Sequence, residues 1–443
     1  MADRTLANRV MYDGLYTFAV RLINIVCAAG LGILTARVLG PAGKGLYSLP
    51  AVEAGLVVTA FGGLNSALSY FLLNRRPGAA ILKPALITAA AYIAVGALAL
   101  LPITLFSGHR NTLLAALLFL PPSAVINLAM GYAVGVKRVR YFTSVNFAVT
   151  VLNLVLMSIG LFLVAREPSV AIAAWLIANW TIALVAAVAV FRHSRTLEGD
   201  QAVSSREFMR FAVKVGLVNL VSLLNYRADV YIVAILATPA DLGLYTVAIA
   251  AAESLLVPTQ VAALVTSPHI GALQAEAAAR LAARCVRNNL LVALVVCGVL
   301  FVFAHPLIAL LYGRAFLPVV PALRILLAGV FTLSLGSPMS TYFTLKLGRP
   351  EVPLRLAAIS AAVCIAVAIF LLPRWGITGA ALGSTAGYAI GQAAAFWYFG
   401  RTTRLGLSAM LMPTRGDLAL YWSFLLRVLR DGRRLLPPMT SAR

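Results

Sequence analysis

The stretch Arg37 to Tyr47, RVLGPAGKGLY, decides the fold, because a shortened copy of it returns past the middle of the chain. Pro239 to Tyr245, PADLGLY, repeats the pattern Pro-Ala-x-x-Gly-Leu-Tyr of Pro41 to Tyr47, displaced by 198 residues. Each copy follows one long apolar segment and opens another. Each is therefore predicted to be the hairpin loop between the first two membrane helices of a repeat, and the chain is expected to have two halves of similar plan.

The glycines and the lysine of this stretch could also suggest a phosphate-binding loop. Such a loop needs Gly six positions before its Lys and Ser or Thr directly after it, and those positions hold Val38 and Gly45. The motif fails at both ends. A tight turn at the membrane surface fits better, with glycines allowing left-handed backbone and Pro41 restricting φ.

Composition identifies an integral membrane protein. Of the 443 residues 61% are hydrophobic and 11% charged, and the mean hydropathy is +0.93. Apolar runs of about 20 residues, long enough to cross a bilayer, recur along the chain. They predict twelve spans, near residues 13–36, 48–73, 84–105, 112–135, 142–164, 169–191, 211–236, 244–266, 288–311, 319–345, 352–372 and 377–400.

The net charge of +22 is explained by the loops between these spans rather than by a nucleic-acid partner. One alternating set of loops, with both termini, carries 26 Lys and Arg, and the other set carries 6. Because basic loops stay in the cytoplasm and face anionic lipid headgroups, both termini are expected there.

The 198-residue displacement contains six predicted spans, so both hairpin loops emerge on the same side of the membrane. We therefore expect an all-α polytopic protein with two parallel six-helix repeats around a central cavity. The predicted domains are an N-terminal bundle (1–200), a C-terminal bundle (201–400) and a basic cytoplasmic tail (401–443). Apolar residues at helical spacing from Leu418 to Leu429 suggest that the tail holds a helix lying on the inner leaflet, the alternative being a disordered basic tail.

Ionisable groups inside apolar spans are the first candidates for function. Each costs about 2.5 to 3.5 kcal/mol at a helix centre, so such residues usually face a bundle interior or a water-filled cavity. Arg227 and Asp229 are two residues apart and cannot share one face of a regular helix, so each is expected to find its partner elsewhere unless the helix is broken. Structural ion pairing or snorkelling is the alternative role for all of them. The candidates are Arg21, Glu53, Arg227, Asp229 and Glu253, with Lys214 and Arg324 nearer to span ends.

Asparagines inside the spans add amide donors and acceptors. For most of them hydrogen bonding between helices is the more common role. Asn65 and Asn225 are retained with Arg21 and Arg227 as candidate substrate-binding residues.

Motifs of the common enzyme classes are missing from the sequence. No GxSxG, HExxH or nucleotide-binding loop occurs, and the four cysteines and four histidines have no metal-binding spacing. No catalytic residue, metal or cofactor is expected.

Three segments resemble the polysaccharide transporter family of the multidrug/oligosaccharidyl-lipid/polysaccharide exporter superfamily. They are ARVLGPAGKGLYSL (Ala36–Leu49), RADVYIV (Arg227–Val233) followed by GLYTVA, and GITGAALGS (Gly376–Ser384). The resemblance covers roughly residues 5–400. It implies two six-helix bundles around a central cationic cavity that moves an undecaprenyl-diphosphate-linked oligosaccharide from the inner to the outer leaflet by alternating access. O-antigen and exopolysaccharide flippases belong to this family.

By position, Arg227 and Asp229 match the family's charged pair of the seventh helix, and Arg21 matches the inward-facing first helix. An arginine-lined cavity suits a diphosphate. With no ATP-binding motif, the driving force would come from an ion gradient or from consumption of the substrate outside. The candidate ion-coupling carboxylates are Asp229, Glu53 and Glu253.

Two other functions stay open: a drug/cation antiporter of the same superfamily, and an enzyme or scaffold of a polysaccharide assembly complex that does not transport. The expected partners are the lipid-linked oligosaccharide, membrane lipids, and the polymerase and glycosyltransferases of the same pathway. The expected location is the bacterial cytoplasmic (inner) membrane.

Overall fold

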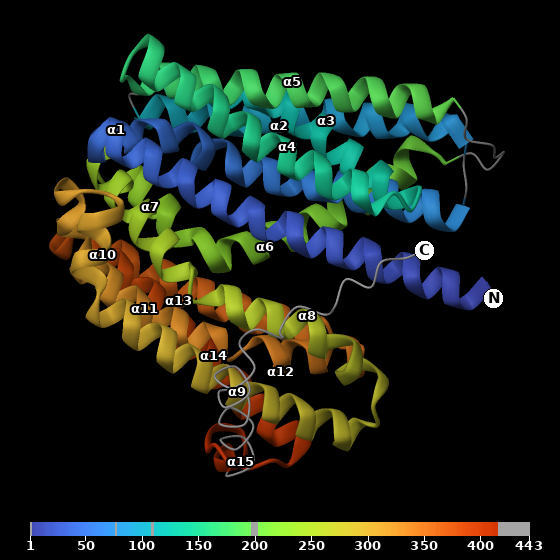
Figure 1. Ribbon diagram of the computed structural model, residues 1–443, viewed down its shortest axis with the longest axis vertical. Coiled ribbons are helices and arrows are strands. Elements are labelled where there is room, and N and C mark those ends of the chain that lie inside the picture. The colour runs from blue at the N-terminus through green and yellow to red at the C-terminus, as the bar shows by residue number, and fades with distance from the viewer. Residues whose placement is uncertain (1, 76–77, 108–109, 196–202, 415–443) are drawn as a thin grey trace, which may run out of the picture. The chain divides into compact units, whose positions relative to one another are not determined.

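The computed structural model describes residues 2–75, 78–107, 110–195 and 203–414, and within these ranges every regular element is a helix (Figure 1). The elements of the first half are α1 (Ala2–Arg75), η1 (Gly78–Ile81), α2 (Leu82–Ser107), α3 (Arg110–Gly135), α4 (Val139–Ile159), η2 (Gly160–Val164) and α5 (Pro168–Ser194). Those that follow are α6 (Ser205–Leu236), α7 (Pro239–Glu253), α8 (Leu256–Ala272), α9 (Ala275–Val302), α10 (Ala304–Leu311), η3 (Arg314–Val319), α11 (Val320–Ser334), α12 (Ser337–Thr341), η4 (Tyr342–Lys346), α13 (Glu351–Trp375), α14 (Ile377–Thr403) and α15 (Leu407–Leu411). The prediction of an all-α polytopic protein is confirmed.

Helix α1 consists of two helices joined at Gly40. This residue has φ of 66° and ψ of −178°, which lies outside the helical region and favours glycine. Pro41 directly follows it, where a fixed φ and a missing N–H suit the first turn of a new helix. The predicted turn is therefore made by one residue, and Gly43 and Gly45 lie in the helix that follows.

Every predicted span coincides with helix, although the bounds differ in places. Among the described residues, eight helices are long and apolar enough to cross a membrane, and nine if the pair α7 and α8, bent by 45°, forms one span. One of the eight runs from Ala19 to Arg75 and contains the Gly40 break, so it holds two of the predicted spans. The count of twelve stays a prediction.

Helix α9 extends about a dozen residues before the start of the ninth predicted span. Helix α9 begins at Ala275 rather than near residue 288. Its added turns are rich in alanine, the best helix former, and Glu276 pairs with Arg280 one turn later at 3.9 Å. Polar residues had marked this segment as a loop, but a helix can continue beyond the membrane.

The chain forms two compact units. Unit 1 contains residues 1–250, 304–326 and 361–384, and unit 2 contains 251–303, 327–360 and 385–443. The predicted six-helix bundles, 1–200 and 201–400, stay a prediction about the bodies that move during function.

In unit 1, α6 packs along the second half of α1, and α1 also contacts α3 and α4 (Figure 1). Within this contact, a side chain on Gly63 of α1 would lie 2.1 Å from the Ala212 carbonyl oxygen of α6, so only glycine lets the two backbones come this close. Further along, the Phe71 and Phe208 rings stack at 5.7 Å within the apolar core. The two helices are therefore in contact over several turns.

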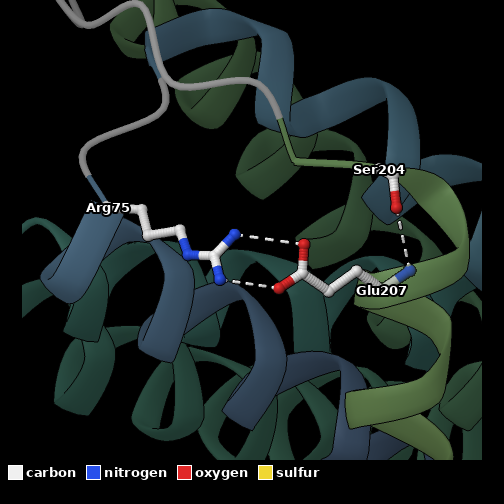
Figure 2. A network of polar contacts seen from close by, with 3 residues as sticks. All are labelled: Arg75, Ser204 and Glu207. Carbon is white, nitrogen blue, oxygen red and sulfur yellow. Dashed lines mark hydrogen bonds and ion pairs between the residues drawn. The ribbon is translucent and has the colours of Figure 1, made fainter.

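An ion pair ends this α1–α6 contact (Figure 2). The Arg75 guanidinium donates to both Glu207 oxygens, at 2.7 and 3.1 Å. The Glu207 backbone N–H donates to the Ser204 hydroxyl at 3.1 Å, which caps the start of α6. The pair thus ties the end of α1 to the first turn of α6.

Unit 2 has its own core around α8, α9, α12 and η4. The short helix α15 belongs to it, since Met410 is buried and Arg287 of α9 donates to the Ala409 carbonyl. The helix predicted on the inner leaflet, from Leu418 onward, lies outside the described residues.

Candidate functional site

A carboxylate buried in unit 1 accepts hydrogen bonds from several parts of the chain. Asp229 of α6 is 2% exposed. One of its oxygens, Oδ2, accepts hydrogen bonds from the Tyr245 hydroxyl at 2.6 Å and from the Ser384 hydroxyl at 2.5 Å, while Oδ1 accepts from the Val230 backbone N–H at 2.8 Å. The Cys364 thiol lies 3.7 Å from the Ser384 hydroxyl. Helices α6, α7, α13 and α14 therefore all meet at this carboxylate.

The geometry of α6 explains why the side chains of Asp229 and Arg227 have different surroundings. Helix α6 is continuous through both residues, so they cannot lie on one face of it. Asp229 turns to the buried side and finds its partners on other helices, as predicted for a regular helix. Arg227 is half-buried and interacts electrostatically with Asp229.

The remaining predicted substrate-binding residues have different surroundings. Arg21 is exposed on α1. Asn65 is half-buried, and its backbone lies against Gly131 of α3. Asn225 is buried one turn before Asp229 on α6, and its Oδ1 atom has no hydrogen-bond partner among the described residues. The role of Arg21 and Arg227 in binding substrate stays a prediction.

The two other predicted carboxylates also differ from each other. Glu53, in the second helix of α1, is 6% exposed, and neither of its carboxylate oxygens reaches a hydrogen-bond partner within the described part of the chain, although Thr112 of α3 interacts with it. Burying a carboxylate with so few hydrogen-bond donors around it is costly. Glu253 is half-buried at the end of α7, next to the bend into α8.

The two copies of the repeated motif are in contact within unit 1, at Gly45 and Gly243. Lys44, in the first copy, is buried and donates to the Thr35 hydroxyl at 2.7 Å. Tyr245, the last residue of the second copy, is the one that reaches Asp229. Sequence reasoning selected Asp229 but missed Tyr245 and Ser384, although both lie in segments that it had quoted.

Comparisons with known proteins agree with this fold. A family model described as "Polysaccharide biosynthesis protein" matches residues 133–321, which is less than half of the chain. No curated protein matches the chain. A multidrug resistance MATE family transporter of the MOP superfamily, in an inward-facing conformation, is similar in structure with a TM-score of 0.73 at 16% identity, over 88% of this chain and 98% of that one.

Two further solved structures are similar. The lipid II flippase MurJ, in an inward closed conformation, has a TM-score of 0.68 at 14% identity, over 93% of this chain and 92% of that one. A MOP superfamily transporter from Pyrococcus furiosus, described as having a binding pocket of reverse polarity, has a TM-score of 0.58 at 18% identity, over 89% and 94%. The family match and the shared fold together confirm the predicted resemblance of this chain to the polysaccharide transporter family of the MOP superfamily.

Proposed function

We propose that this protein is a membrane transporter that moves a lipid-linked oligosaccharide diphosphate from the inner to the outer leaflet by alternating access. The observation that carries the proposal is the match of residues 133–321 to a polysaccharide biosynthesis family in a chain with a MOP-type fold. A diphosphate cannot cross hydrocarbon unaided, because a charge loses its hydration there at high cost. A protein that offers partners inside the membrane lowers this cost.

The diphosphate would be held by arginine side chains. Arg227 is half-buried on α6, and Asn225, on the same face of the helix as Asp229, has a buried amide oxygen without a hydrogen-bond partner among the described residues. A guanidinium binds phosphate oxygens through two parallel hydrogen bonds, which a lysine cannot reproduce. We assign Arg227 and Arg21 to the diphosphate, and Asn225 and Asn65 to polar groups of the substrate.

Coupling to an ion gradient would use the buried carboxylates in different ways. Asp229 is held by two hydroxyl donors and one backbone N–H, an arrangement that suits an ionised carboxylate or one that shares a cation. Glu53 lacks a comparable set of donors, since Thr112 is the one described residue found to interact with it, and it suits a carboxyl that carries a proton. We assign Asp229 as the coupling residue, which binds and releases the driving ion in each transport cycle. Glu53 and Glu253 are assigned as secondary carriers of that ion. The products would be used at the outer surface of the bacterial inner membrane by the polymerase of the same pathway.

A drug/cation antiporter is the second candidate, because MATE transporters share the fold. In that case the carboxylates would bind the exported cation, and the arginines would be dispensable. A scaffold that does not transport would need neither the carboxylates nor the arginines.

Variants of these residues distinguish the candidates in cells that depend on the chain for surface polysaccharide. Arg227→Ala is expected to abolish or strongly reduce export, and Arg227→Lys to retain part of it, while protein levels persist. Lys214→Ala, on an exposed position of the same helix, is the matched control and is expected to export normally. Normal export by both Arg227→Ala and Arg21→Ala would remove the proposed diphosphate site. Loss of small-cation export, with unchanged surface polysaccharide, in Asp229→Asn would favour the antiporter.

A further inference from the structure

The helix that continues from α11 through α12 is irregular at two places, both in unit 2. Helix α11 ends at Ser334, whose carbonyl loses its helical partner because Pro338, four residues later, has no N–H. The Asn289 amide of α9 donates to this carbonyl instead, at 3.2 Å. The second irregularity is η4, a π-helical turn directly after α12. Interrupted membrane helices and π-helical turns are both frequent at binding sites.

Between these irregularities the helix has two contrasting faces. Met339 and Tyr342 are buried in the core of unit 2. The opposite face carries half-buried or exposed hydroxyl groups at helical spacing, and we call it the hydroxyl face: Ser337, Ser340, Thr341 and Thr344. The Thr341 hydroxyl lies 3.4 Å from the Ser267 hydroxyl of α8. The other three hydroxyls form no hydrogen bond within the described part of the chain.

These three unbonded hydroxyls indicate that the hydroxyl face meets water rather than lipid. A hydroxyl without a partner is costly in hydrocarbon, so serine and threonine side chains there commonly bond back to a carbonyl of their own helix. Thr266 of α8 does so, with the Ala262 carbonyl at 2.9 Å. The face ends just before the basic loop at residues 346–355, so we expect water to reach it from the cytoplasmic side.

A buried amide of α14 lies against the start of this face. Gln392 is 8% exposed, and its Nε2 donor has no acceptor among the described residues. A side-chain carbon on Gly336 would lie 2.6 Å from the Gln392 Oε1 atom, so the glycine makes room for the amide. Gly336 is half-buried and precedes Ser340 by one helical turn, which places it on the hydroxyl face. A buried donor without an acceptor is unusual in a native protein, and a ligand or a water can satisfy it.

We propose that the hydroxyl face of unit 2, together with Gln392, binds the uncharged sugar part of the transported molecule. Hydroxyl and amide groups both donate and accept hydrogen bonds, as sugar hydroxyls do, and the face itself carries no charged side chain. The inference rests on the proposed transport function. It assigns the sugar to unit 2, whereas the diphosphate was assigned to arginines of unit 1. The alternative is a helix bent for packing alone, whose hydroxyls bind only water.

Protection of a cysteine on the hydroxyl face tests the proposal. The tested protein carries Ser340→Cys, with the four native cysteines replaced by alanine. Its reaction with a negatively charged methanethiosulfonate is followed in detergent. The added lipid is either the undecaprenyl-diphosphate oligosaccharides extracted from cells in which the chain is native, or undecaprenyl diphosphate without sugar. At ten times their Kd, the oligosaccharide lipids should slow the reaction about tenfold, whereas undecaprenyl diphosphate should leave it unchanged.

Other variants control for indirect effects. Glu276→Cys, on the highly exposed first turn of α9, should react equally fast with and without either lipid. Gln392→Leu removes a donor that has no partner, so the melting temperature should not fall. Its affinity for the oligosaccharide lipids should fall about threefold to tenfold, with no change for undecaprenyl diphosphate. Gln274→Leu, exposed before α9, is the matched control and should change neither affinity.

The outcomes separate this inference from the proposed function. An unprotected Ser340→Cys, in a protein that retains the oligosaccharide lipids during purification, would overturn the sugar site and leave the transport proposal standing. Equal slowing by both lipids would also overturn it, because the diphosphate would then occupy the face. Parent affinity in Gln392→Leu would remove the amide from the site. A parent protein that retains none of the extracted lipids would reject the proposed function and the inference with it.

Discussion

Removal of the Tyr245 hydroxyl should reveal whether Asp229 is held as a charged group. Tyr245→Phe keeps the ring, which is fully buried, and deletes only the donor that lies 2.6 Å from Oδ2 of Asp229. A hydrogen bond to a charged group contributes about 1.5 to 3 kcal/mol, whereas one between neutral groups contributes about 0.5 to 1.5 kcal/mol. The Ser384 hydroxyl and the Val230 N–H remain, so the fold should persist.

We expect Tyr245→Phe to lower the free energy of unfolding by about 1.5 to 3 kcal/mol. At about 2 °C per kcal/mol, the low end for domains of 150 to 250 residues, the melting temperature should fall by roughly 3 to 6 °C. The measurement is thermal unfolding of the detergent-purified protein, followed by the reaction of its buried cysteines with a thiol-sensitive dye.

The same substitution in an Asp229→Asn background provides the decisive comparison. There the Tyr245 hydroxyl bonds to a neutral amide, so its removal should cost about half as much or less. Tyr16→Phe serves as a control, because it removes a hydroxyl bonded at 3.0 Å to Ser144 at an exposed position and should change stability by no more than about 0.5 kcal/mol. An equal loss in the parent protein and in the Asp229→Asn background would refute the assignment of a charged carboxylate.

Three further predictions concern the ends of the helices and the topology. A double-mutant cycle with Arg75→Ala and Glu207→Ala should give a coupling energy of only about 0.2 to 1 kcal/mol in unfolding experiments, because the two side chains are 41% and 42% exposed; a value above about 2 kcal/mol would show that the pair is screened far less than its exposure implies. Met410→Ala should lower the free energy of unfolding by about 2 to 5 kcal/mol in the same thermal assay, because the side chain is 1% exposed in the core of unit 2; an unchanged melting temperature would separate α15 from that core. A cysteine introduced at Glu167 should react with an impermeant reagent added outside intact cells, and one at Arg138 should not; the reverse result would invert the proposed orientation.

The fold followed from the sequence where the pattern was long or repeated. Apolar runs of membrane length predicted the helices, and the displaced copy of Pro41–Tyr47 predicted two related hairpins. The left-handed Gly40 could be expected because Gly-Pro marks a turn. That the hairpins would touch at Gly45 and Gly243 could not, since a sequence does not say which loops on one side of a membrane meet.

Residues that act through distant contacts were missed for a related reason. Asp229 could be selected because a carboxylate in an apolar span is costly. Ser384 lies 155 positions further along the chain, at the end of a segment of small residues that are typical of close helix packing. A serine among glycines and alanines gives no separate signal of a hydrogen bond to a carboxylate. The buried Met410 was hidden similarly, within a region that the basic charge marked as a solvated tail.

The two candidate substrate-binding arginines show that equivalent helices of the two repeats need not give their side chains the same surroundings. Arg21 and Arg227 are both candidate substrate-binding residues in the first helix of a repeat, but they differ in surroundings: Arg21 is exposed on α1, and Arg227 is half-buried on α6. Equivalent positions in two repeats share backbone geometry, whereas the neighbours of their side chains depend on the packing of each half.

Reconstituted flipping of a lipid-linked oligosaccharide tests the central claim most directly. The purified protein is placed in vesicles whose inner leaflet carries a fluorescent undecaprenyl-diphosphate oligosaccharide, and an impermeant glycosidase outside reports the arrival of the sugar. We predict release that depends on time and on the protein, that is lost in Arg227→Ala, and that responds to a proton or sodium gradient unless Asp229 is replaced by Asn. Release at the rate of protein-free vesicles, under every gradient and with every sugar tried, would contradict the account.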